Sequence, residues 1–175
     1  SELRYILGEH VQQAGSLVAP GRLRFDFTHP AMLTEDELSL VTQSVNDAIL
    51  VNYPVEITQE KYQQAVSEGV IALFGEKYGD EVRVIKIGVP EEPFSQELCG
   101  GTHVRRTGEL GAFMIVSEEA VSAGVRRITA LVGEAALQYA GALREREDRL
   151  VGTLGGRPDE LEERVAKLQD DLKQA

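Results

Sequence analysis

The hydrophobic periodicity of the chain changes at Gly133, and this change constrains the fold more than any other sequence feature. Before Gly133, apolar residues form short segments that are separated by glycine and proline, and several of them alternate with polar residues. After Gly133, apolar residues recur at spacings of four and three, which is typical of amphipathic helices. We therefore divide the chain into an N-terminal part, residues 1–133, and a helical part, residues 134–175.

The N-terminal part carries local signals for both strands and helices. Residues 16–19, the Pro20–Gly21 turn and residues 22–27 predict a β-hairpin, because the second arm alternates polar and apolar residues. Leu23, Phe25 and Phe27 are expected on its buried face. Further helices are expected at 1–9, from the capping box Thr34–Glu37 to Asn52, and at 60–68, with strands at 55–57, 81–89, 113–117 and 125–132. Together these elements predict an α+β fold, with helices packed on a mixed or antiparallel sheet.

The helical part has two apolar stripes separated by a break at residues 155–158. Pro158 suits the first turn of the second helix. The spacing predicts two amphipathic helices that form either an antiparallel hairpin or a coiled-coil arm, and such an arm offers a surface for self-association. The stripes comprise Ala136, Ala140, Leu143, Leu150 and Leu154, then Leu161, Val165, Leu168 and Leu172.

Charge and cysteine content restrict the environment and the partners. With 18 basic and 29 acidic residues the net charge is -11, which argues against non-specific binding of nucleic acid. The single cysteine, Cys99, forms no internal disulfide, which favours a reducing compartment such as the cytoplasm. The sequence has neither a membrane-spanning apolar run nor a secretory leader. Helical patterns without start or stop signals at both ends predict that the chain is a fragment.

Cys99 and His103 are four residues apart across Gly100–Gly101, and they are the first candidates for chemistry. The diglycine permits left-handed backbone conformations, so the loop can bring a thiolate and an imidazole together. Both groups are preferred zinc ligands. The pattern alone also fits a buried cysteine beside a surface histidine, and a nucleophilic Cys–His pair lacks an evident third partner.

Other polar residues offer weaker signals. Gln13 precedes a predicted strand, where its amide can serve a polar substrate group or face solvent. His29 precedes Pro30 and is most simply a turn residue. Three arginine pairs are either solvated strand ends or local contacts for phosphate: Arg22 with Arg24, Arg105 with Arg106, and Arg126 with Arg127.

Several phrases of the sequence together resemble the editing domain of bacterial alanyl-tRNA synthetases. The resemblance covers essentially all of residues 1–133, and the helical part is similar to the arm that follows the editing domain in that family. The phrases, in order, are LGEHVQQAGSLV at 7–18, RLRFDF at 22–27, ALFGEKYGD at 72–80, ELCGGTHV at 97–104, RTGELG at 106–111 and AGVRRI at 123–128.

The resemblance implies a function, a cofactor and partners. The family hydrolyses serine or glycine wrongly attached to tRNA(Ala), and the implied partners are the mischarged 3′ end and the rest of the synthetase chain. Gln13 matches the glutamine thought to sense the serine hydroxyl, and Cys99 and His103 match two zinc ligands. The arginine pairs are expected to contact tRNA.

One departure from the family limits this expectation. The family supplies its other two zinc ligands from an H-x-x-x-H on a preceding helix, and no histidine precedes His10 here. We therefore expect half a zinc site, with weak zinc binding and weak or absent hydrolase activity in this chain. A free-standing editing factor, the related domain of threonyl-tRNA synthetase, and an inactive scaffold that oligomerises through its helices remain alternatives.

Overall fold

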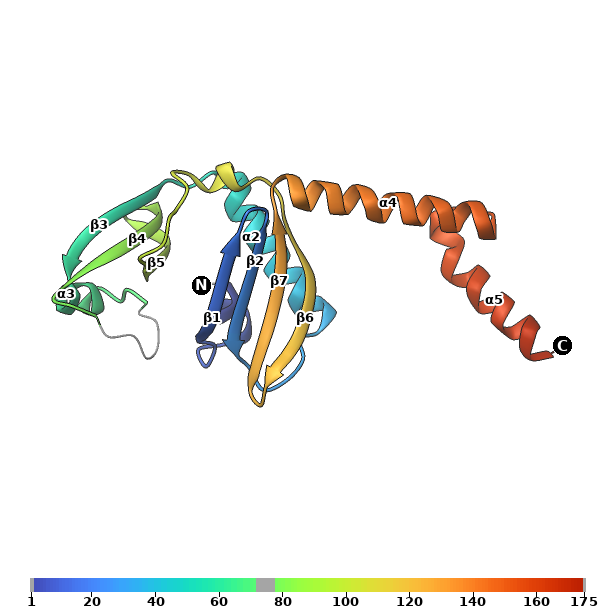
Figure 1. The fold of residues 1–175 in the computed structure, drawn as a ribbon, viewed down its shortest axis with the longest axis horizontal. Helices are drawn as coiled ribbons and strands as arrows, with labels where there is room; N and C mark the ends of the chain where they lie inside the picture. Colours follow the sequence, from blue (N-terminus) through green and yellow to red (C-terminus); the bar gives the residue numbers. More distant parts are fainter. Residues whose placement is uncertain (1, 72–77, 175) are drawn as a thin grey trace. The chain divides into compact units, whose positions relative to one another are not determined.

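The computed structural model describes residues 2–71 and 78–174. It forms two compact units, residues 1–136 and residues 137–175 (Figure 1). The division falls in the first turn of a helix rather than at Gly133, because Ala136 is still buried. No helix of the described chain is long and apolar enough to cross a membrane.

The first unit contains a four-stranded antiparallel sheet. Its strands are β1 (Gln13–Ala19), β2 (Arg22–Thr28), β6 (Phe113–Ser122) and β7 (Val125–Val132), in the spatial order β1-β2-β7-β6. The predicted hairpin at Pro20–Gly21 is confirmed as the β1–β2 connection. The predicted strand at 113–117 is longer than expected and continues to Ser122.

Gly21 is required at the tip of this hairpin. Its φ of 69° lies in the left-handed region, which favours glycine. A Cβ on Gly21 would also lie 2.9 Å from the Cβ of Ala135, so the tip packs closely against the residues that follow the sheet.

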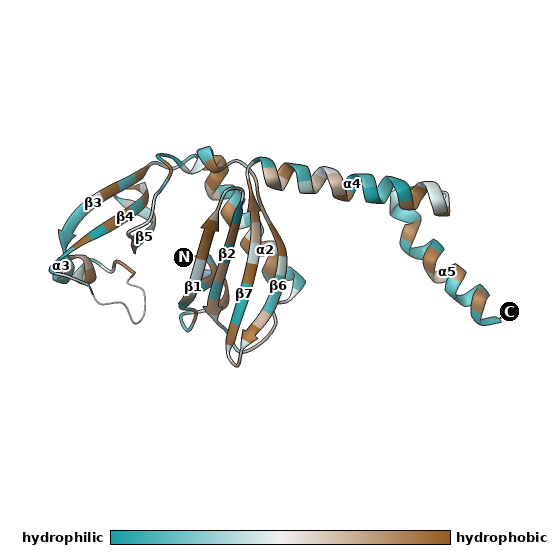
Figure 2. Ribbon diagram, viewed as in Figure 1, coloured by the Kyte–Doolittle hydropathy of each residue, from teal (hydrophilic) through white to brown (hydrophobic). Residues whose placement is uncertain are grey.

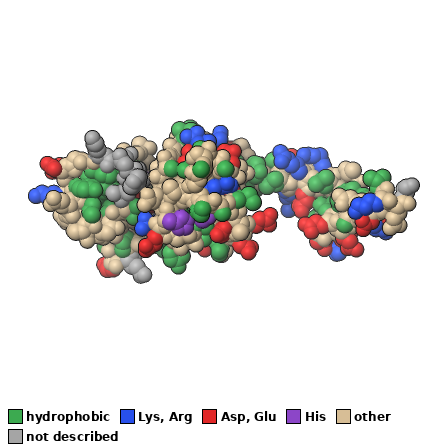
Figure 3. All heavy atoms as spheres, turned by 90° about the horizontal axis from the view of Figure 1, so that it is seen from below, with side chains coloured by type: hydrophobic (Ala, Val, Ile, Leu, Met, Phe, Trp, Pro, Cys, Tyr) green, Lys and Arg blue, Asp and Glu red, His purple; other side chains and the backbone are tan. Residues whose placement is uncertain are grey.

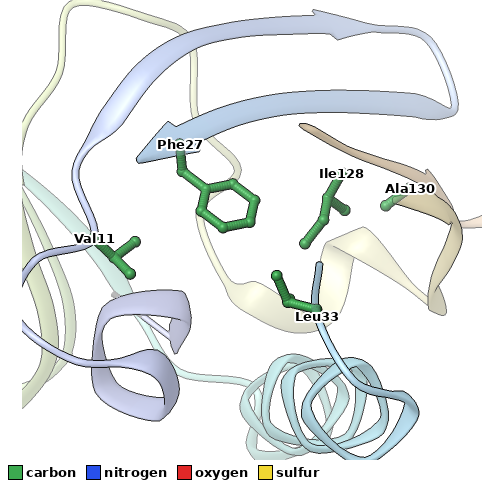
Figure 4. Packing of buried hydrophobic residues seen from close by; sticks show 5 residues of the cluster. All are labelled: Val11, Phe27, Leu33, Ile128 and Ala130. Carbon is green, nitrogen blue, oxygen red and sulfur yellow. The ribbon is translucent and has the colours of Figure 1, made fainter. Parts of the chain in front are cut away.

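Two helices cover one face of the four-stranded sheet, α1 (Glu2–Leu7) and α2 (Glu35–Val51). Leu23 and Phe25 are partly buried and Phe27 is fully buried, so the predicted inner face of β2 is confirmed. Figure 4 shows the apolar side chains between the sheet and the helices. The buried residues of this core are Val11, Phe27, Leu33, Ile128 and Ala130.

The predicted boundaries of α2 are also confirmed. The Thr34 hydroxyl accepts a hydrogen bond from the Glu37 amide at 3.2 Å, and the Glu37 carboxylate accepts one from the Thr34 amide at 2.8 Å. This reciprocal capping box satisfies amides that lack partners within the helix. The helix ends at Asn52, whose left-handed φ of 60° redirects the chain towards Pro54.

A second, smaller sheet carries the segment in which Cys99 lies. It consists of β3 (Val55–Lys61), β4 (Glu81–Val89) and β5 (Glu92–Leu98), antiparallel in that order, with the short helix α3 (Tyr62–Ser67) beside it. β3 is longer and α3 shorter than the sequence predicts. The buried apolar residues of this sheet and helix are Ala65, Val70, Val82, Val84 and Leu98.

The sequence does not predict the strand β5. The segment contains Pro93 and mostly polar side chains, so it shows no apolar alternation. It is an edge strand that pairs with β4, where Leu98 lies opposite Val84. The phrase at 72–80, which contributed to the family resemblance, lies largely outside the described residues.

The second unit contains α4 (Glu134–Leu154) from Leu137 onward, the short 3₁₀ helix η2 (Pro158–Glu160) and α5 (Leu161–Gln174). Of the two arrangements expected, the structure shows an arm rather than a hairpin, because α4 and α5 do not lie side by side (Figure 1). Arg164 on α5 donates to the Leu154 carbonyl at 3.0 Å, which holds the bend. Figure 2 shows hydrophobic residues recurring along both helices. Leu143, Leu150, Val165, Leu168 and Leu172 are all exposed.

Candidate functional site

Cys99 and His103 lie on the loop that leaves the buried end of β5. Both side chains are partly buried. A Cβ built on Gly101 would lie 3.6 Å from the Cys99 Sγ and 4.0 Å from the His103 Cε1. Both side chains therefore lie near one point beside Gly101, and their joint binding of a metal ion stays a prediction. Neither Gly100 nor Gly101 has a left-handed φ, so the loop achieves this without the conformation that we expected the diglycine to supply.

The surroundings of His103 favour its neutral form. Burial lowers the pKa of the His103 imidazole, and the positive charge of Arg83 acts in the same direction. The His103 Nδ1 is buried and has no hydrogen-bond partner among the described residues. A neutral imidazole with an unpartnered ring nitrogen is the form that coordinates a metal ion.

This pair satisfies only part of what a zinc ion requires. A thiolate and a neutral imidazole match the donor chemistry of zinc, and the unpartnered Nδ1 is consistent with a missing ligand. Structural zinc sites use four protein ligands, whereas the described residues contain no group of three or more histidine, cysteine or acidic side chains suited to a metal ion. Among the residues that the structure describes, Cys99 and His103 thus offer two donors without a third.

His10 and His29 contact each other, and no group of three or more metal-binding side chains among the described residues joins them to Cys99 and His103. The His10 Nε2 lies 2.9 Å from the His29 Nδ1, and the two rings stack with centroids 5.1 Å apart. Figure 3 shows histidine side chains gathered on one surface of the molecule. The Thr28 hydroxyl donates to the His10 carbonyl at 2.7 Å and accepts from the Gln12 amide at 2.9 Å. These contacts fasten the segment before β1 to the end of β2.

Gln13 is the first residue of β1, and it directly follows the segment that Thr28 holds. It pairs in register with Phe27, next to an irregularity in the strand pairing. Its side-chain amide donates to the Ser16 hydroxyl at 3.0 Å. No contact described in the structure joins Gln13 to Cys99 or His103, and the two candidate regions lie on different sheets.

The arginines differ in how far they are committed to contacts within the chain. Arg127 forms two hydrogen bonds with the Asp26 carboxylate, at 2.7 and 2.8 Å, and the Arg24 Nε lies 3.9 Å from the same carboxylate. Arg126 pairs with the buried Glu118 carboxylate.

The remaining arginines are more accessible. Arg106 donates to the Asn52 carbonyl at 2.7 Å. Arg22 is exposed at the start of β2, and the Arg105 side chain is 94% exposed and only loosely paired with Glu109. Arg22 and Arg105 are therefore the predicted phosphate contacts most accessible to a nucleic acid.

Arg83 is a residue of this region that sequence reasoning missed. It lies between the buried residues Val82 and Val84 in β4, and its guanidinium reaches the loop of Cys99. A charged side chain within an apolar strand is a signal that could have drawn attention to it, but the partner could not be inferred without the β4–β5 pairing.

Part of this region matches a known domain family. Residues 82–129 match the family described as the threonyl and alanyl tRNA synthetase second additional domain. The matched segment contains most of β4, all of β5 and both Cys99 and His103. This part of the chain is therefore similar to a domain of threonyl and alanyl tRNA synthetases.

Whole-chain comparisons find similarity to alanine–tRNA ligases. The chain is 50% identical to the alanine–tRNA ligase of Burkholderia vietnamiensis (strain G4 / LMG 22486) over 171 residues, which are 98% of this chain and 19% of that protein. It is 51% identical to the alanine–tRNA ligase of Thermotoga maritima over 173 residues, 98% of this chain and 20% of that protein. The chain thus spans about a fifth of the length of these relatives. The resemblance to alanyl-tRNA synthetases is confirmed.

Proposed function

We propose that this chain is the editing part of an alanine–tRNA ligase and serves to hydrolyse Ser-tRNA(Ala) and Gly-tRNA(Ala). The observation that carries the proposal is the placement of Cys99 and His103 on one side of Gly101, within the matched synthetase domain. The identity of about 50% to alanine–tRNA ligases over 98% of the chain supports the choice of tRNA.

Substrate chemistry explains why such a synthetase needs a second site. An alanine pocket cannot exclude glycine by size, and it rejects an added hydroxyl by only about a hundredfold. A separate site that accepts the misattached amino acid and hydrolyses its ester removes the error. On this proposal the Gln13 amide recognises the serine hydroxyl, since one amide group both donates and accepts hydrogen bonds.

Cys99 and His103 would hold a zinc ion through two of its four positions. The remaining ligands would come from an H-x-x-x-H such as the family supplies, which this sequence lacks. When bound, zinc supplies positive charge for orienting the tRNA 3′ end and for stabilising the oxyanion that develops during ester hydrolysis. The loop residues act by fixing where the sulfur and the ring nitrogen lie.

Metal analysis tests the ligand assignment. We expect the chain to retain well under one zinc ion per molecule after dialysis, because two donors bind zinc poorly compared with four. Cys99→Ala is expected to remove the remaining affinity, whereas Ser95→Ala, in the middle of the preceding strand β5, is the control. Stoichiometric zinc that persists in Cys99→Ala would contradict both the assigned ligand and the half-site.

Deacylation assays test the activity. We expect this chain to hydrolyse Ser-tRNA(Ala) slowly or not at all, and a longer chain that includes an H-x-x-x-H to hydrolyse it rapidly. In the longer chain, Gln13→Ala should slow hydrolysis of Ser-tRNA(Ala) more than that of Gly-tRNA(Ala), because only serine carries the hydroxyl. Equal losses on both substrates would assign Gln13 to another role, and rapid turnover by the short chain would show that the two donors suffice.

The proposed partners are tRNA(Ala), with its mischarged 3′ end, and the rest of the synthetase. Binding of tRNA by this chain should be weak, because the net charge of -11 opposes it. We expect a combined Arg22→Ala and Arg105→Ala variant to weaken filter binding at low salt. Arg126→Ala and Arg127→Ala break contacts with Glu118 and Asp26. A loss of tRNA binding in either variant therefore counts only if thermal unfolding shows that the variant is still folded.

A further inference from the structure

Arg83 holds the Cys99–His103 loop through both its side chain and its backbone. Its Nη1 donates to the Cys99 carbonyl at 3.0 Å and also to the Gly101 carbonyl. The Arg83 backbone carbonyl accepts a hydrogen bond from the Cys99 amide at 3.3 Å. One residue of β4 therefore contacts the loop on both sides of Gly100.

The two glycines of the loop do little to define its conformation. Gly100 and Gly101 have no side chains to pack, and a Cβ built on Gly100 would meet no atom within 4 Å. Glycine also loses more conformational freedom on ordering than other residues do. Because Nη1 carries two hydrogens, one guanidinium nitrogen can bind two carbonyls at once and fix the peptide groups that separate the two proposed ligands.

Arg83 itself is well anchored for this task. It lies in the central strand of its sheet, in register with Gln59 on β3, and it is flanked by the buried residues Val82 and Val84. Because the central strand is held on both sides, the Arg83 backbone has a fixed position. Its two side-chain hydrogen bonds therefore fix the loop relative to the sheet.

We propose that Arg83 is a positioning residue that holds Cys99 and His103 in the geometry in which both can bind one metal ion. This inference rests on the proposed function, because it takes these two residues to be ligands. Residues that orient metal ligands in this way typically contribute about 10- to 100-fold to metal affinity.

Arg83→Gln is the test variant, and Lys86→Gln is its matched control. Lys86 lies on the same strand, and its substitution removes the same charge, but its ion pairs are with Glu60 at 2.8 Å and Glu68 at 3.8 Å. Both variants and the unchanged chain are examined by amide hydrogen exchange at residues 99–103 and by zinc titration followed through the NMR signals of the same residues. Thermal unfolding establishes that each variant is folded.

We expect Arg83→Gln to raise loop amide exchange and to weaken zinc binding by about tenfold or more. Lys86→Gln should change neither by as much, although it removes ion pairs of the same sheet. Unchanged exchange in Arg83→Gln, or a loss of zinc affinity no greater than that in Lys86→Gln, would overturn the inference. Cys99→Ala distinguishes this failure from that of the proposed function, because zinc binding insensitive to Cys99→Ala removes the ligand assignment itself.

Discussion

Asp26 is the carboxylate on which arginines from two strands converge. Arg127 of β7 binds both of its oxygens, and Arg24 of β2 lies nearby. The hydrogen bonds from Arg127 hold the pKa of the Asp26 carboxyl below its usual value, against the opposing effect of burial. The sequence showed paired arginines that were available for phosphate, but in the structure the Arg127 guanidinium binds Asp26 across the pairing of β2 with β7.

Because the pKa of Asp26 is lowered in the folded state, the free energy of unfolding should depend on pH. A carboxyl with a lower pKa in the folded state contributes stability above its unfolded pKa of about 3.9 and loses it as the pH falls through the folded value. We expect Asp26→Asn to lower the free energy of unfolding by about 1 kcal/mol near pH 7, since it removes charged hydrogen bonds from a pair that water partly screens. Urea unfolding as a function of pH measures both effects.

Asp47→Asn is the control for that measurement, because Asp47 is exposed on α2. The difference in stability between the unchanged chain and Asp26→Asn should shrink as the pH falls below about 4. A difference that is constant with pH would show that the carboxylate charge is not what stabilises the pair.

At the scale of the elements, α2 begins where its capping box lies. The Thr34 hydroxyl and the Glu37 carboxylate each bind the other residue's amide, and Leu38 follows directly into the core. We expect Thr34→Ala to lower the free energy of unfolding by about 1 kcal/mol, because an amide of the first turn loses its partner. Thr34→Ser keeps the hydroxyl and should retain most of the stability in thermal or urea unfolding. Equal losses in the two variants would indicate that the methyl group of Thr34 matters rather than the cap.

Elements with signals within a few residues could be predicted from the sequence, and those defined by distant partners could not. The capping box at Thr34 and the turn at Pro20–Gly21 are local, and both are confirmed. β5 depends on pairing with β4, and its polar residues give no alternation that marks a strand. In the candidate site, the spacing of Cys99 and His103 predicts their approach, but the hydrogen bonds of Arg83 arise only once β4 and β5 are paired.

At the scale of the whole chain, the candidate chemistry and the exposed apolar stripe belong to different units. Cys99, His103 and Gln13 all lie in residues 1–136. The second unit contributes none of the proposed site residues, yet it exposes leucines such as Leu150 and Leu172, which are 54% and 79% accessible. Apolar residues spaced along a helix and left uncovered are typical of a surface that packs on another helix.

We therefore expect the chain to self-associate through its arm and the first unit to fold without it. Analytical ultracentrifugation over a range of concentrations should show association of the full chain, and a Leu150→Glu, Leu168→Glu variant should sediment as a monomer because charges on the stripe oppose its burial. A chain ending at Ala136 should also be monomeric. This shortened chain should unfold at the same temperature as the first unit does within the full chain, because the core residues Phe27 and Ile128 lie within the retained segment. If the full chain is already a monomer at all concentrations, the exposed stripe has no role in self-association, and a contact with a different protein segment becomes the remaining explanation for it.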